Sequence, residues 1–142
     1  MRRLIALAVL VAAAGTLPAL ALGSAAKTVR LEAKMSGSNE VPKAGGARGE
    51  AYVQITGTKV CWQFKNLHGF TGATASHIHK APVGKAGPVL VPLGAGFKKA
   101  GCTTAPAGVA RGIVRNPKAY YVNIHTTKFP GGALRGQLGT ED

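Results

Sequence analysis

The fold is decided by the stretch GEAYVQITGTKVCWQFKN, residues 49–66. Apolar residues alternate with polar ones on both sides of Gly57-Thr58, and this period of two is typical of half-buried β-strands. A two-residue link between two such segments predicts a β-hairpin. The side chains expected to point into a core are Val53, Ile55, Val60, Trp62 and Phe64, and those expected to face water are Gln54, Lys59, Gln63 and Lys65.

Similar short segments follow along the chain, separated by glycine and proline. We predict seven strands, at residues 28–35, 49–56, 59–66, 74–80, 88–93, 119–126 and 132–139. Residues 106–117 have a brief helical period that ends at Asn116-Pro117, so one short helix is expected there. Seven short strands, each with one buried face, predict an all-β antiparallel Greek-key sandwich or flattened barrel.

The same alternation assigns faces in the later strands. We expect the inward side chains to be Val89, Val91, Leu93, Tyr120, Val122, Ile124, Leu134 and Leu138, and the outward ones to include Asn123, Arg135 and Gln137.

The first 26 residues differ from the rest of the chain. Arg2 and Arg3 precede an apolar run over residues 4–14, and small residues with an A-x-A pattern follow. This is the pattern of a secretory signal peptide, and the run is too short to span a bilayer. We therefore expect residues 1–26 to be a cleaved signal and residues 27–142 to be a single domain without a membrane span. The expected destination is the periplasm, the cell envelope or the medium.

The chain is strongly basic. It carries 18 Lys and Arg against 5 Asp and Glu, a formal net charge of +13, and loss of Arg2 and Arg3 with the signal leaves +11. The charges are scattered singly, which is typical of a solubilising surface and compatible with attraction to anionic envelope polymers. Nucleic acid is not an expected partner, because the protein is exported and its few aromatic residues form no stacking platform.

Two cysteines, Cys61 and Cys102, occur in a chain predicted to reach an oxidising compartment. We expect them to form a disulfide, because their wide spacing lacks the C-x-x-C pattern of a redox or metal pair. By alternation Cys61 shares the outer face of its strand with Gln63 and Lys65. The bond is therefore expected to tether a loop carrying Cys102 to the outside of the sheet.

The segment TASHIHK, residues 74–80, places His77 and His79 two positions apart, on one face of an extended strand. His125 is available as a third ligand if strands 74–80 and 119–126 are neighbours, and three histidines suit zinc or copper. The alternative is that these rings hydrogen-bond to carbonyls of the loop KAPVGKAGP and hold it in place. His68, in NLHG, is a weaker candidate ligand.

Hydrolytic chemistry finds little support in the sequence. Three carboxylates, Glu32, Glu40 and Glu50, precede the terminal pair, and no aspartate precedes Asp142. Neither a Ser-His-Asp triad nor a pair of catalytic carboxylates is easily built from this set. For Glu40 we expect a salt bridge or a turn-capping hydrogen bond, with Arg135 as its candidate partner.

Five segments in order resemble the pattern of the CHRD domain, the module first described in chordin: MSGSNEVP (35–42), NLHG (66–69), ATASHIHKAPVGKAGPVLVPL (73–93), YYVNIHT (120–126) and FPGGALRGQL (129–138). The resemblance covers about residues 28–139. It implies an exported β-sandwich of immunoglobulin-like or superoxide-dismutase-like kind, with no agreed biochemical activity. It places the family's motif positions at Asn39, Glu40, His77, His79, Gly87, Pro88, Asn123, His125, Arg135 and Gly136.

A count of ligands limits the superoxide-dismutase likeness. A copper-zinc dismutase of the usual form needs six histidines and an aspartate for its two metals, whereas this chain has four histidines and no internal aspartate. A dinuclear site of that type is therefore excluded, and a mononuclear copper or zinc site remains.

Three functional hypotheses follow from these observations. The leading one is a non-enzymatic exported binding or structural module, whose loops around residues 66–88 and 126–133 meet an extracellular or envelope partner. The second is mononuclear copper or zinc binding by His77, His79 and His125. The third is electrostatic adhesion to anionic envelope polymers.

Overall fold

The hairpin predicted from residues 49–66 is present in the computed structural model, which describes residues 25–141. Strands β2 (Arg48–Thr56) and β3 (Lys59–His68) pair antiparallel, with Val53 opposite Trp62. Gly57 occupies the link with a φ of 61°, a left-handed conformation that glycine adopts without steric cost. The other elements are β1 (Thr28–Ser36), η1 (Gly37–Asn39), β4 (Ala73–Lys80), β5 (Val89–Pro92), β6 (Ala100–Thr104), α1 (Ala107–Arg115), η2 (Pro117–Ala119), β7 (Tyr120–Thr126), β8 (Leu134–Gln137) and β9 (Gly139–Thr140).

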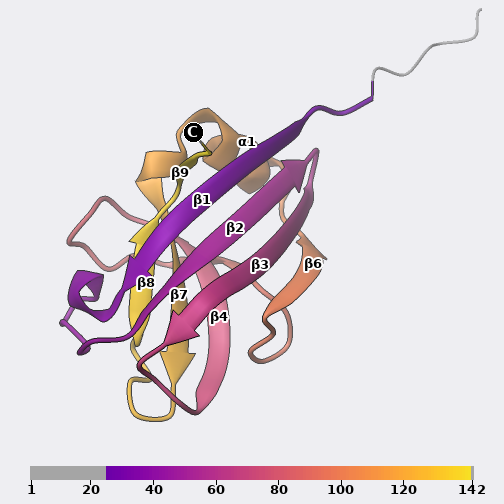
Figure 1. Ribbon diagram of the computed structural model, residues 1–142. Coiled ribbons are helices and arrows are strands. Elements are labelled where there is room, and N and C mark those ends of the chain that lie inside the picture. Colours follow the sequence, from indigo (N-terminus) through magenta and orange to yellow (C-terminus); the bar gives the residue numbers. More distant parts are fainter. Residues whose placement is uncertain (1–24, 142) are drawn as a thin grey trace, which may run out of the picture.

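Nine antiparallel strands within residues 25–141 form one sheet that curls into a nearly closed, flattened barrel. The strand order is β5-β4-β7-β8-β1-β2-β3-β6, and β9 pairs with β1. Strands β1, β2 and β3 form one wall, and β4, β7 and β8 lie behind them (Figure 1). The predicted all-β flattened barrel with one short helix is therefore confirmed.

The core lies between these two walls and consists of the side chains that alternation predicts. Most are completely buried, and each buried Val, Leu or Ile side chain contributes about 1.5 to 3 kcal/mol relative to an exposed one. Predicted inward residues that are buried are Val53, Ile55, Val60, Trp62, Phe64, Val91, Leu93, Tyr120, Val122, Ile124, Leu134 and Leu138.

Val89 is the inward prediction that is wrong, because its side chain is 46% exposed. Strand β5 pairs with β4 through an irregularity between Ile78 and His79, where Val91 lies opposite Ile78 and Val89 opposite His79. The extra residue changes the parity of the strand, and Val89 comes out on the solvent side.

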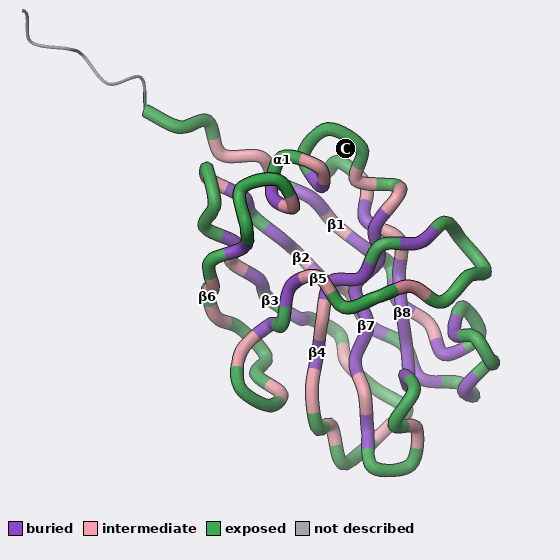
Figure 2. The backbone as a smooth tube through the Cα atoms, turned by 180° about the vertical axis from the view of Figure 1, so that it is seen from behind, coloured by how far each residue is buried: buried purple, intermediate pink, exposed green. Residues whose placement is uncertain are grey.

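Asn123 and Arg135 were predicted to face water, and that prediction is also wrong. They are only 1% and 4% exposed. Strands β7 and β8 are buried along nearly their whole length in Figure 2. Both side chains do point away from the apolar core, but loops cover this outer face, as described for the candidate site below.

Two of the nine strands, β6 and β9, were not predicted. Strand β6 reads AGCTT and has little apolar alternation, because only one of its edges is paired and its side chains are mostly outside the core. Cys61 and Cys102 do form the expected disulfide, and they lie directly opposite each other in β3 and β6. Cys102 therefore lies in a strand, and the prediction that it lies in a loop is wrong.

The predicted signal peptide, residues 1–26, lies outside the described residues except for its last two positions. Across residues 25–141, no helix has the length and apolar character needed to cross a membrane.

Replacement of both cysteines by serine should destabilise the protein. The disulfide joins residues 41 positions apart, and closing such a loop reduces the entropy of the unfolded chain by an amount worth about 4 kcal/mol. We expect urea unfolding of the Cys61→Ser/Cys102→Ser protein to show that loss. An unchanged free energy of unfolding would mean that the bond does not restrict the unfolded chain.

Candidate metal centre

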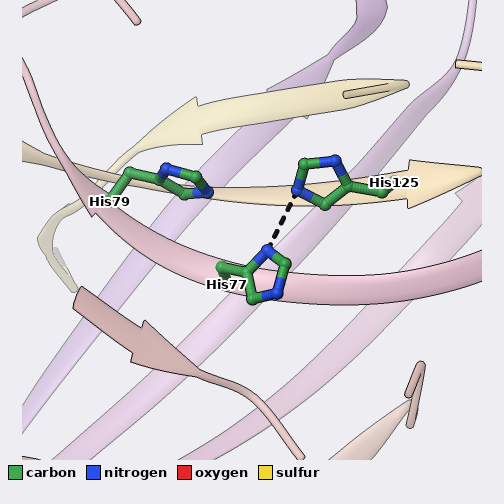
Figure 3. Close-up of side chains that lie close together, drawn as sticks. All are labelled: His77, His79 and His125. Carbon is green, nitrogen blue, oxygen red and sulfur yellow. Dashed lines mark hydrogen bonds between the residues drawn. The ribbon is translucent and has the colours of Figure 1, made fainter. Parts of the chain in front are cut away.

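Strands β4 and β7 pair side by side and bring the three histidines to one face. His77 lies opposite Asn123, His79 opposite Tyr121, and Ala75 opposite His125. One ring nitrogen from each of His77, His79 and His125 lies within 4.8 Å of those of the other two. Figure 3 shows the rings of His77 and His79, from β4, and of His125, from β7, turned toward a common centre. The prediction that His125 lies on a strand next to that of His77 and His79 is confirmed.

His125 and His77 are linked directly. His125 Nδ1 is 2.8 Å from the Pro130 carbonyl oxygen, and His77 Nδ1 is 3.0 Å from His125 Nε2. Because a carbonyl only accepts, Nδ1 of neutral His125 carries its proton and Nε2 is left with a lone pair. The donor between the two rings is therefore His77 Nδ1, and a lone pair of His125 already points at the centre of the group.

His79 is the most buried of the three, with 6% of its surface exposed. Its Nδ1 donates to the Gly87 carbonyl oxygen at 2.9 Å, and its ring stacks on Tyr121 at 4.8 Å between centroids and 7° between planes. Its Nε2 is buried and has no hydrogen-bond partner among the described residues. Buried polar atoms are nearly always paired, so this nitrogen calls for an explanation.

Burial favours the neutral form of two of these rings, those of His77 and His79. It lowers the pKa of His77 to about 4, with a further contribution from the neighbouring His125 and His79 rings. Burial also lowers the pKa of His79, although the Gly87 carbonyl oxygen favours the charged ring and partly opposes this. Neutral imidazoles are the form that binds a metal, so protons compete little with a metal for His77 and His79 at neutral pH.

Residues 81–88 pass over the outer face of β4, β7 and β8 and fasten to it. Arg135 Nη1 donates to the Lys85 carbonyl oxygen at 2.9 Å, and Gln137 Nε2 donates to that of Ala81 at 2.7 Å. The Gly87 N–H donates to the Tyr121 hydroxyl at 3.2 Å. A β-carbon at Gly87 would collide with the Lys80 carbonyl oxygen, so only glycine lets the loop lie this close. The structural alternative, in which the histidines hold this loop, is thus confirmed for His79.

A buried ion pair stands beside the histidines. Arg135 Nε donates to Glu40 Oε2 at 2.6 Å, and both side chains are nearly inaccessible. Burial raises the pKa of Glu40, and the hydrogen bond from Arg135 opposes that rise. Asn39 Nδ2 donates to the Arg135 carbonyl oxygen at 3.3 Å. The predicted partnership of Glu40 with Arg135 is confirmed, and it joins η1 to β8 next to the site.

Other candidate residues lie elsewhere. His68 ends β3, is exposed, and is not part of the three-histidine group. Cys61 and Cys102 lie in β3 and β6, at the opposite end of the strand order from β4 and β5.

Sequence reasoning missed Tyr121 as part of the site, and it named Asn123 only as a motif position expected to face water. Tyr121 is 2% exposed and lies between the His79 ring and the Arg135 guanidinium, whose carbon is 4.1 Å from the centre of the Tyr121 ring. The available signal was that the outward positions of residues 120–126 all carry groups able to hydrogen-bond.

Comparison with known proteins gives a family. The family model of the CHRD domain matches residues 31–138, most of the chain. The chain belongs to the CHRD domain family. No curated protein and no solved structure matches it. In this CHRD domain, Glu40, His77, His79, Gly87, Asn123, His125 and Arg135, motif positions of the resemblance, lie on the outer face of β4, β7 and β8 or in the loops beside it.

The depressed histidine pKa values predict a pH-dependent stability. Because His77 and His79 bind a proton less readily in the folded state, the unfolded chain takes up more protons below its ordinary histidine pKa of 6.5. The free energy of unfolding should be constant above pH 6.5 and fall as the pH drops toward 4. Urea unfolding at pH 7, 6 and 5 measures this, and His77→Gln should reduce the slope. An equal slope in the two proteins would contradict the assignment.

Loss of one partner of the buried ion pair should be costly. Arg135→Met leaves the Glu40 carboxylate buried without its cation, which typically costs about 3 to 5 kcal/mol of stability. Arg111→Met, on the exposed side of α1, is the matched control and should change the free energy of unfolding little. Equal stabilities of the two variants, measured by denaturant unfolding, would argue against this role of Arg135.

Proposed function

We propose that this CHRD domain is an exported, non-enzymatic metal-binding module that holds one zinc or copper(II) ion between His77, His79 and His125. The observation that carries the proposal is the buried Nε2 of His79, which has no hydrogen-bond partner among the described residues while its ring is fixed from the other side. A bound cation supplies the missing partner of this lone pair.

The surroundings of the rings support this proposal. Metal-binding histidines usually donate their other ring N–H to a carbonyl or carboxylate, which fixes the tautomer and the ring orientation. His79 and His125 both do so, to Gly87 and Pro130, and each has an unprotonated Nε2. Nε2 of His79 has no partner among the described residues, and Nε2 of His125 accepts from His77 Nδ1. To offer Nδ1 to a metal, His77 would carry its proton on Nε2 in place of Nδ1.

The donor set favours particular metals. Three imidazoles suit zinc and copper(II), whereas copper(I) prefers thiolate and thioether sulfur. The described residues place no sulfur in the group: the two cysteines are joined in the disulfide, and Met35 is buried in the core.

A purely structural role for the histidines accounts for less of the geometry. Hydrogen bonds from His79 and His125 to loop carbonyls explain their Nδ1 atoms, but they leave His79 Nε2 buried and unpaired. Leaving a buried polar atom without a partner costs about 1 to 3 kcal/mol. Adhesion to anionic polymers through the basic surface makes no use of this face.

Export and the absence of catalysis complete the proposal. Export rests on the signal-like residues 1–26, and the disulfide between Cys61 and Cys102 suits an oxidising compartment. The chain carries few carboxylates, and the only one described as buried, Glu40, is paired with Arg135. Among the described residues, no buried carboxylate free of an ion pair is available beside the histidines to act as a general acid or base.

Metal binding can be measured on the protein without residues 1–26. After treatment with chelator and addition of zinc, we expect one equivalent of zinc per chain by elemental analysis and isothermal titration. The His77→Ala/His125→Ala protein should lose this zinc, because one ligand cannot hold it. His68→Ala is the matched control and should bind as the wild type does. Absence of stoichiometric zinc and copper(II) from the wild type refutes the proposal, and equal loss in the control would place the metal elsewhere.

A further inference from the structure

Asn123 shares the outer face of β4 and β7 with the three histidines, and the inference about it rests on the proposed metal site. We propose that the side-chain oxygen of Asn123, Oδ1, is a fourth contact to the metal, so that the site offers three imidazole nitrogens and one amide oxygen.

The register of the strands gives Asn123 its central position. It lies directly opposite His77 on β4 and two residues before His125 on β7, so all three side chains share the outer face. His79 is its diagonal neighbour, because His79 pairs with Tyr121. Side chains of diagonal neighbours across a sheet remain within reach of each other. No other single position in β7 adjoins all three histidines.

The side-chain oxygen of Asn123, like His79 Nε2, is buried without a hydrogen-bond partner among the described residues. Asn123 is 1% exposed, and its Oδ1 has no hydrogen-bond partner in the described part of the chain. The Asn123 amide lies near enough to His79 to favour the charged form of that ring, although the two side chains form no hydrogen bond of good geometry.

Two facing acceptors explain why no bond forms. His79 has its proton on Nδ1, where Gly87 accepts it, so Nε2 presents a lone pair. The Asn123 carbonyl oxygen presents lone pairs as well, and two acceptors attract only through a proton or a metal cation between them. A cation at the centre of the group satisfies both atoms together.

A rotated amide gives the opposite prediction. The oxygen and nitrogen of an asparagine amide are interchanged by a half turn. In the rotated state Nδ2 would donate to His79 Nε2, block that nitrogen, and compete with the metal. Removal of the amide would then strengthen metal binding, whereas removal of a ligand weakens it.

The fourth contact also bears on what the site does. In a four-coordinate zinc ion, a protein oxygen in the fourth position leaves no place for the water molecule that catalytic zinc sites activate. A site of this kind stores or carries the ion, or stabilises the fold, without hydrolysing a substrate.

The decisive comparison is zinc affinity in the wild type and Asn123→Leu, which keeps a similar volume without an acceptor. We expect the substitution to weaken zinc binding by at least about 10- to 100-fold, because loss of even an outer-shell partner of a metal ligand has an effect of that size. Asn116→Leu is the control, because Asn116 is exposed and its side chain makes no capping hydrogen bond to η2. Unchanged or tighter zinc binding by folded Asn123→Leu overturns the inference and leaves the three-histidine site standing. A wild type that binds neither zinc nor copper(II) overturns both proposals.

A second measurement needs no substitution, in case Asn123→Leu does not fold. The chain has four asparagines, Asn39, Asn66, Asn116 and Asn123, so protein labelled with carbon-13 at the asparagine side-chain carbonyls gives four signals. Zinc should move the Asn123 signal downfield, because the metal polarises its carbonyl, and leave the other three in place. An unmoved Asn123 signal in zinc-saturated protein overturns the inference.

Discussion

The structure depends on the burial of a polar sheet face. Strand β7 places Val122 and Ile124 in the apolar core, and it also buries Tyr121 and Asn123 on the opposite side. Polar groups removed from water must find partners, since each unpaired one costs free energy. Most of these partners come from three places: the loop of residues 81–88, the Arg135–Glu40 pair and the Pro130 carbonyl oxygen. The loops around the site are therefore held by the polar groups that they cover.

The histidines are oriented by the same constraint. The carbonyl oxygens of Gly87 and Pro130 accept hydrogen bonds from Nδ1 of His79 and His125. The loops that cover the face therefore also determine that Nε2 of each ring is unprotonated. A few buried side-chain atoms among the described residues have no hydrogen-bond partner. Two of them, His79 Nε2 and Asn123 Oδ1, belong to this polar face. These two unpaired atoms lie where the rings of His77, His79 and His125 converge, which is the physical basis of the proposed metal site.

Alternation of side chains was sufficient to predict the barrel and the composition of its core. It also predicted that His77, His79 and His125 share a face, because parity along a strand is a local property of the backbone. It failed for Asn123 and Arg135, since the period of a strand says which way a side chain points but not whether a distant loop will cover it. It failed for Val89 because a bulge resets the parity. Strand β6 was not predicted, because its sequence AGCTT has little apolar alternation. Its pairing with β3 and the disulfide hold it in the sheet.

The account is tested most directly by diffraction from crystals of zinc-saturated protein at the zinc absorption edge. It predicts one anomalous peak per chain on the outer face of β4 and β7, about 2.0 to 2.1 Å from one nitrogen each of His77, His79 and His125. In the same crystals the Gly87 and Pro130 carbonyls should still accept from His79 and His125. A peak at His68 or another surface position, or fully zinc-exposed crystals with no peak between the three rings, would contradict it.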